Sequence, residues 1–79
     1  MARVLLFGAL SDLAGWRQRD VDCSSLTNLR ALLGSGDPRL GEALIGPGVQ
    51  VALDQVLVRG DAMLTASSEV AFLPPMSGG

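Results

Sequence analysis

The last two residues of the chain, Gly78 and Gly79, are the ones that we expect to carry chemistry. An α-carboxyl group is ionised at neutral pH, so the carboxylate expected on Gly79 can act as a nucleophile. The two glycines place no side chain beside it, and such a thin thread can enter the active site of another protein. The alternative is a frayed and inert chain end, because chain termini are commonly disordered.

The rest of the sequence offers no nucleophile and base of the usual kinds. It has no histidine and one cysteine, Cys23. One cysteine excludes an internal disulfide and a multi-cysteine zinc or iron–sulfur site, and it fits a reducing compartment. Cys23 is either a carrier of persulfide sulfur or a small buried apolar residue, the commoner role. Asp20 and Asp22 share a strand face without further ligands, so we expect no metal site.

The composition predicts one small domain that binds neither nucleic acid nor membranes. The chain has 79 residues, of which 48% are apolar, and a net charge of −2. This charge argues against nucleic acid or an anionic membrane as the partner. No apolar run approaches the roughly 18 residues of a membrane span, and no signal peptide is visible, so we expect a cytoplasmic protein.

The residues before the terminal glycines predict how they are held away from the domain. Pro74 and Pro75 have no amide hydrogen, so a strand that precedes them must stop pairing at Leu73. Two prolines also favour a stiff, extended chain, and residues 74–79 could reach roughly 20 Å from the domain. We therefore expect a domain over residues 1–73 and an extended tail over residues 74–79.

Hydrophobic periodicity predicts the elements of that domain. Alternating or continuous apolar runs indicate strands, and leucines spaced three and four apart indicate the main helix. The expected strands cover residues 3–8, 16–23, 49–53, 56–58 and 69–73. A turn-forming link with at most one helical turn covers residues 11–15, and a short second helix covers residues 40–45.

Local signals predict where the helices begin and end. Ser25 is the expected N-cap of the main helix and Gly34 its stop. Asp37 followed by Pro38 is the start signal of the second helix. The glycines of residues 46–48 lack the setting of a phosphate-binding loop, so we assign them no nucleotide role. Residues 59–61, Arg-Gly-Asp, are interpreted as a strand-end turn.

This order of elements predicts an α+β fold of the β-grasp type, with a mixed sheet, one main helix and a short second helix. In that fold the last strand lies parallel beside the first, and one face of the sheet stays uncovered. Strict alternation then places Leu5, Phe7, Ala71 and Leu73 on the uncovered face. Such an apolar patch at the root of the tail is a candidate docking surface, unless a second helix or a loop covers it.

Several segments resemble the molybdopterin synthase small-subunit family, which belongs to the ubiquitin-like sulfur carriers and has a β-grasp fold. The most specific is the ending Glu-Val-Ala-Phe-Leu-Pro-Pro-Met-Ser-Gly-Gly over residues 69–79. The apolar residues 4–7, the link at 13–15 and the turn at Asp54 and Gln55 agree with it. One departure is Ser11, where many relatives have an arginine before the acidic residue that Asp12 matches.

The resemblance implies that Gly79 is adenylated with ATP by an activating enzyme and becomes a thiocarboxylate. The sulfur then attacks cyclic pyranopterin monophosphate and builds the dithiolene of molybdopterin. The chain would be a sulfur-donating subunit that is not catalytic on its own and holds no permanent cofactor. Implied partners are a large subunit, in a heterotetramer, a ubiquitin-activating-enzyme-like adenylyltransferase and a sulfur donor such as a cysteine desulfurase. The expected partner-binding residues are Leu5, Phe7, Ala71, Leu73, Pro74, Pro75, Met76 and Ser77.

Other functions stay open at this point. The chain could carry sulfur for thiazole, cysteine or tRNA thiolation. It could also be a ubiquitin-like modifier that is attached to lysines through Gly79, or an interaction module with an inert tail. These classes differ in whether the carboxylate of Gly79 reacts and in what it is joined to.

Overall fold

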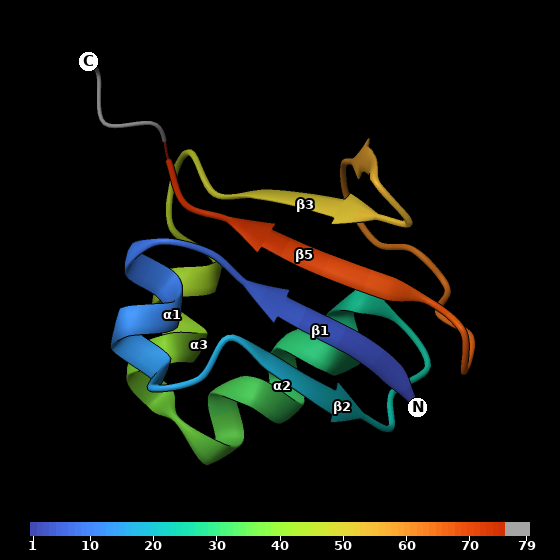
Figure 1. Cartoon of the computed structure of the whole chain (residues 1–79), viewed down its shortest axis with the longest axis horizontal. Helices are drawn as coiled ribbons and strands as arrows, with labels where there is room; N and C mark the ends of the chain where they lie inside the picture. Colours follow the sequence, from blue (N-terminus) through green and yellow to red (C-terminus); the bar gives the residue numbers. More distant parts are fainter. Residues whose placement is uncertain (76–79) are drawn as a thin grey trace.

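The structure, a computed structural model, describes residues 1–75 as one sheet with helices on one of its faces (Figure 1). The predicted tail residues Met76, Ser77, Gly78 and Gly79 lie outside the described residues. The strands are β1 (Ala2–Leu6), β2 (Gln18–Val21), β3 (Gln50–Leu53), β4 (Val56–Val58) and β5 (Glu69–Leu73). The helices are α1 (Ala9–Ala14), α2 (Leu26–Gly36) and α3 (Pro38–Leu44).

The sheet has the strand order β2-β1-β5-β3-β4. The first and last strands, β1 and β5, run parallel at its centre, and every other neighbouring pair is antiparallel. Figure 1 shows α2 and α3 behind the sheet and α1 beside α3 at one end. This arrangement confirms the predicted β-grasp fold.

The core lies between the sheet and α2 and α3. Alternate residues of β1 and β5 point into it, and Val4, Val70 and Phe72 are fully buried. The helices supply leucines at the predicted spacing of three and four residues. These leucines are Leu26, Leu29 and Leu33 of α2 and Leu40 and Leu44 of α3.

The predicted stop of the main helix was wrong. Helix α2 continues past Gly34 to Gly36, because Gly34 lies where α2 crosses α3 rather than at the helix end. A β-carbon added to Gly41 of α3 would lie 2.5 Å from the Cα of Gly34, so the two backbones need both glycines to approach this closely. The helix ends instead at Asp37, whose backbone is extended before Pro38.

The boundaries of the first three elements also differ from the prediction. Strand β1 ends at Leu6, and the expected link is helix α1, which Gly15 closes in the left-handed conformation at φ 83°. Strand β2 covers four of the eight residues predicted for it. Trp16 precedes the strand and packs on the core. The Arg19 guanidinium carbon lies 4.4 Å from the centre of the Trp16 ring, a cation–π contact.

The predicted caps and the hairpin turn are confirmed. The Ser25 hydroxyl accepts a hydrogen bond from the Asn28 N–H at 3.0 Å, and the Asp37 carboxylate accepts one from the Leu40 N–H at 3.2 Å. Asp54 and Gln55 both have positive φ, as the two-residue turn between β3 and β4 requires. In residues 1–75 no helix has the length and apolar character to span a membrane.

Candidate functional site

A row of apolar residues crosses the face of the sheet that the helices leave open. In the strand register Leu5 of β1 pairs with Ala71 of β5, Ala71 with Ala52 of β3, and Ala52 with Leu57 of β4. Paired residues of neighbouring strands point to the same side of a sheet. Leu57 at the edge is 58% exposed, while the three central residues are half-buried.

Phe7 and Leu73 extend this row toward the end of β5. Phe7 follows β1 directly and is 46% exposed, and its N–H donates a hydrogen bond to the carbonyl of Phe72 at 3.3 Å. Leu73 pairs with Gln50 and is half-buried. The four residues expected on the uncovered face thus lie together. We call Leu5, Phe7, Ala52, Leu57, Ala71 and Leu73 the open face.

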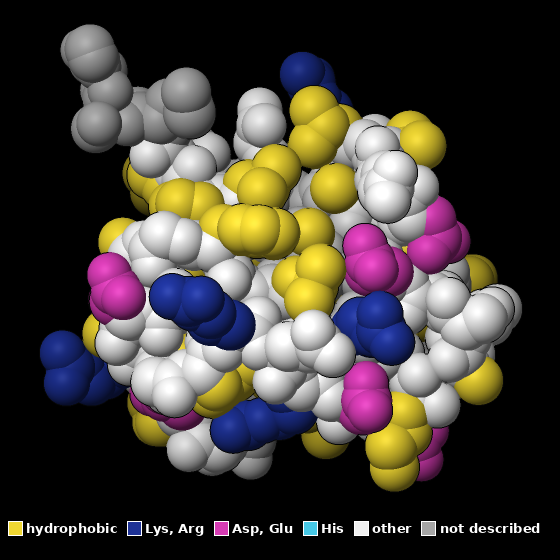
Figure 2. All heavy atoms as spheres, in the orientation of Figure 1, with side chains coloured by type: hydrophobic (Ala, Val, Ile, Leu, Met, Phe, Trp, Pro, Cys, Tyr) yellow, Lys and Arg dark blue, Asp and Glu magenta, His cyan; other side chains and the backbone are white. Residues whose placement is uncertain are grey.

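Charged side chains border the open face where β1 and β5 begin, and Asp12 and Arg17 lie near Phe7 at its other end. Figure 2 shows hydrophobic side chains gathered over β1, β5 and the β3–β4 hairpin, with acidic and basic groups below and to the right of them. The charged end includes Arg3, which pairs with Asp20 on one side and with Glu69 on the other. No helix or loop of residues 1–75 covers the open face, so the covered alternative does not apply to this part of the chain.

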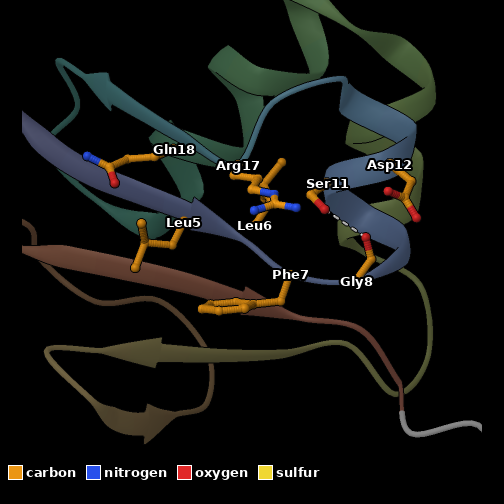
Figure 3. A pocket seen from close by; sticks show the side chains of 8 residues that line it. All are labelled: Leu5, Leu6, Phe7, Gly8, Ser11, Asp12, Arg17 and Gln18. Atoms are coloured by element: carbon orange, nitrogen blue, oxygen red, sulfur yellow. Dashed lines mark hydrogen bonds between the residues drawn. The ribbon is translucent and has the colours of Figure 1, made fainter.

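A surface pocket of about 380 Å³ adjoins Phe7 at the start of α1. Leu5, Leu6, Phe7, Gly8, Ser11, Asp12, Arg17 and Gln18 line it. Figure 3 shows Leu5 and Phe7 on the side of β5 and the polar groups Ser11, Asp12 and Arg17 by the helix. The sequence reasoning did not assign Arg17 or Gln18 to the site. The pairing of Gln18 with Leu5 in the β1–β2 hairpin is the signal that could have placed them there.

Position 11 offers no charged group to a partner. The Ser11 hydroxyl donates a hydrogen bond to the carbonyl of Gly8 at 2.8 Å, within its own helical turn. Arg17 supplies a cation to the same pocket from the segment that leads into β2. The pocket therefore has a basic group although residue 11 is a serine.

The tail leaves the sheet beside Phe7 and Leu73. Pro74 is half-buried and Pro75 is exposed, and both follow β5 at the end where the pocket lies. Of the expected partner-binding residues, Leu5, Phe7, Ala71, Leu73, Pro74 and Pro75 are described, and the structure brings them to one end and one face of the sheet. Met76 and Ser77, and the reactive Gly78 and Gly79, fall outside the described residues.

The environment of Cys23 agrees with a small packed side chain. Its thiol donates a weak hydrogen bond to the carbonyl of Val21 at 3.7 Å, and the side chain packs against the core. Burial, and secondarily the charge of Asp22, raise the pKa of the thiol. A raised pKa disfavours the thiolate, which is the reactive form of cysteine.

The Asp61 carboxylate has a structural role. The Asp61 carboxylate accepts hydrogen bonds from the N–H groups of Thr27 and Ala62, both at 2.9 Å, and so fastens the residue 59–61 turn to the start of α2. Its pKa is lowered, chiefly by the Thr27 N–H. Within the described part of the chain no three acidic, histidine or cysteine side chains gather in a group that could hold a metal ion.

Comparison with known proteins agrees with the resemblance drawn from the tail. The chain is 35% identical over 81 residues to the molybdopterin synthase sulfur carrier subunit of Escherichia coli (strain K12), with all of both chains covered. Its fold matches the solution structure of the small archaeal modifier protein 1, SAMP1, from Methanosarcina acetivorans. The TM-score is 0.88 at 20% identity, over 99% of this chain and 95% of that one.

A second SAMP1, in a crystal structure from Haloferax volcanii, matches with a TM-score of 0.80 at 25% identity, over 99% of this chain and 98% of that one. The model of the ThiS family matches residues 4–79, which is nearly the whole sequence. This chain therefore belongs to the ThiS family, and the resemblance to the ubiquitin-like sulfur carriers is confirmed.

Proposed function

We propose that this protein is the sulfur carrier subunit of a molybdopterin synthase. The observation that carries the proposal is the place of Pro74 and Pro75. They continue a central strand of the sheet at the end where Phe7 and Leu73 form the open face. A docking surface and the root of a reactive tail therefore adjoin each other. The full-length identity with the Escherichia coli subunit supports this particular pathway.

The proposed chemistry begins at the carboxylate of Gly79. In an activating enzyme, one of its oxygens attacks the α-phosphate of ATP, and pyrophosphate leaves. Sulfide then attacks the acyl carbon of the adenylate, and AMP leaves with the transferred oxygen, so that Gly79 carries a thiocarboxylate. Where the donor is a persulfide, the attack gives an acyl disulfide, and a thiol of the partner reduces it to the thiocarboxylate and forms a disulfide. The sulfur of this group is finally given to cyclic pyranopterin monophosphate. The chain has no histidine or lysine, so we assign the acid and base groups of each step to the partners.

The proposed large subunit covers the open face and receives the tail. Burial of apolar residues such as Phe7 and Leu73 would supply most of the binding free energy, because buried aromatic and aliphatic anchors dominate protein interfaces. The charged end of the face, with Arg3, Asp20 and Glu69, would lie at the polar rim and help to orient the partner.

The test is the intact mass of the protein after incubation with ATP, the activating enzyme and sulfide. Exchange of one oxygen for sulfur should raise the mass by about 16 Da, and fragmentation should place the change at Gly79. A control variant that lacks Gly78 and Gly79 should show no increase. An unchanged mass of the wild-type protein, with an activating enzyme proven on another carrier, would exclude the proposal.

A second candidate function is that of a protein modifier, which the similarity to the two SAMP1 structures favours. In that case Gly79 would be joined to lysines of other proteins by isopeptide bonds. Adducts of high mass that survive thiol reductants, and in which fragmentation places the carboxyl of Gly79 on a lysine ε-amino group, would identify it. A carrier for thiazole, cysteine or tRNA thiolation would also gain 16 Da. It would be distinguished by the large partner that co-purifies with it.

A further inference from the structure

Two glycines from distant loops flank the two prolines at the root of the tail. Gly8 lies between β1 and α1, and a β-carbon added to it would lie 3.1 Å from Cγ of Pro74. Gly48 lies between α3 and β3, and a β-carbon added there would lie 2.7 Å from Cβ of Pro75. At the second distance any side chain on residue 48 would displace the proline. We call Gly8 and Gly48 the proline seat.

The strand register explains why these two residues meet the prolines. Leu6 pairs with Phe72 in the parallel β1–β5 pair, and the same offset places Gly8 opposite Pro74. Gln50 pairs with Leu73 in the antiparallel β3–β5 pair, and the same register places Gly48 opposite Pro75. Pro74 and Pro75 therefore occupy the first two positions after β5, where the pairing has stopped.

Prolines in these positions cannot donate the hydrogen bonds that would hold a longer strand in the sheet. Close packing against glycine backbone replaces that ladder on both sides. Contacts at van der Waals distance between rigid groups restrict direction, because the pyrrolidine ring has few conformations of its own. The proline seat therefore restrains the line along which the chain leaves β5, as far as the described residues reach.

The loops themselves are built to keep the two glycines in place. Residues 46–49 form a turn in which the Val49 N–H donates to the carbonyl of Gly46 at 3.4 Å. Pro47 occupies the second position, and Gly48 the third with φ 84°, as in a type II turn. Gly8 has φ 55° and directly precedes α1, with its carbonyl accepting from the N–H groups of Ser11 and Asp12.

We propose that Gly8 and Gly48 are positioning residues that aim the tail, by seating Pro74 and Pro75, toward the active sites in which Gly79 reacts. This inference rests on the proposed sulfur-carrier function. It assigns a role to a glycine loop that the sequence analysis had left without one. A tail that leaves the domain in a set direction reaches a partner's active site with less loss of conformational entropy than one that must be captured.

The chain offers matched controls for Gly48. Gly15 and Gly60 also have positive φ, 83° and 74°, but nothing lies within 4 Å of a β-carbon added to either. Gly15→Ala and Gly60→Ala therefore impose the same kind of backbone strain without touching the tail. Any loss in Gly48→Ala beyond the loss in these controls comes from the contact with Pro75.

The functional test measures thiocarboxylate formation on each variant over a range of carrier concentrations, with the activating enzyme. We expect kcat for Gly48→Ala to fall on the order of tenfold below that of Gly60→Ala, with KM changed by less than about twofold, since a positioning role acts on the reacting step and not on docking. Gly8→Ala is not used as a comparison, because Gly8 has ψ −131° where Gly15 has ψ 12°, so its backbone strain differs from that of the controls. Equal kcat values for Gly48→Ala and Gly60→Ala would overturn the proposal.

A double-mutant cycle keeps the test decisive if Gly48→Ala is unstable. Pro75→Gly removes the β-carbon that the added methyl group meets, so Gly48→Ala should cost no more in melting temperature or kcat in that background than Gly60→Ala costs in the wild type. A defect of the same size with and without Pro75→Gly would overturn the proposal.

A nuclear Overhauser contact between the Gly48 α-protons and the Pro75 β-protons tests the proline seat without an activity assay. If the wild-type protein gains no sulfur, the proposed function is wrong. The nuclear Overhauser contact and the double-mutant cycle in melting temperature would still show whether the proline seat restrains Pro75.

Discussion

The two phenylalanines of the chain lie next to each other on opposite faces of the sheet. Phe72 in β5 is fully buried, while Phe7, just after β1, is 46% exposed. The two are joined by the hydrogen bond from the Phe7 N–H to the Phe72 carbonyl. Two phenylalanine side chains on neighbouring strands thus have opposite surroundings: Phe72 lies in the packed core, and Phe7 faces solvent.

This difference shows how a small domain can separate stability from recognition. The alternation of a strand sends successive residues to opposite faces, so a change on one face need not disturb the other. Helices α2 and α3 cover the face of Phe72, and nothing in residues 1–75 covers that of Phe7. We interpret the inner face as the source of folding free energy and the open face as a surface kept for a partner.

The largest expected effect is that of Phe72→Ala. Truncation of a buried phenylalanine costs about 3–5 kcal/mol through lost burial and the cavity that remains. A domain of this size has a free energy of unfolding of about 4–12 kcal/mol, so the variant should lose a large share of its stability. Urea denaturation followed by circular dichroism measures the change.

Phe7→Ala is the matched control for this experiment. Because Phe7 is nearly half exposed, its truncation should cost less than about 1 kcal/mol. Similar losses in the two variants would show that the open face also belongs to the folding core, and the separation of roles would be wrong.

The second prediction concerns binding of a partner, for which Phe7 should matter although it matters little for stability. Phe7→Asp should weaken binding of the large subunit by roughly thirtyfold or more, the effect of losing an apolar anchor in an interface. The free energy of unfolding should change little, since an exposed position tolerates a charge. Calorimetric titration against the purified large subunit measures the binding.

Met63→Asp controls for the added charge. Met63 is 78% exposed and bridges to Ser25 beside the start of α2, away from the open face, so its variant should bind as the wild type does. Unchanged binding by Phe7→Asp would show that the partner uses another surface. Loss of binding in both variants would point to overall charge instead of the open face.

Much of the inner face was predictable because it depends on local periodicity. The order of elements, the inward Val70 and Phe72, the caps at Ser25 and Asp37 and the hairpin turn follow from rules that act within a few residues. The open face followed in turn, once β1 and β5 were taken to be parallel neighbours.

The error at Gly34 occurred because that residue acts on a partner distant in sequence. Gly34 looked like a helix stop because glycine often ends helices, but its role depends on Gly41 of the next helix. Gly8 and Gly48 likewise gain their meaning only from Pro74 and Pro75. A glycine shows in the sequence that a side chain is absent, but only the fold shows what occupies the space.

The smallest expected effect concerns the charge that fastens α2 to the loop after β4, and it tests whether the helical cover of the inner face depends on pH. The N–H of Thr27 lowers the pKa of Asp61 in the folded state, so the ionised carboxylate stabilises the fold above the pKa of the unfolded chain. That contribution is lost as the pH falls through the folded-state pKa of Asp61.

The melting temperature of the wild type should thus decrease more than that of Asp61→Asn between about pH 6 and about pH 3, and the two curves should converge in acid. Asp22→Asn, which removes one negative charge at the exposed end of β2, controls for net charge. Parallel curves for the wild type and Asp61→Asn would mean that the charge of Asp61 adds nothing to stability through its contact with Thr27.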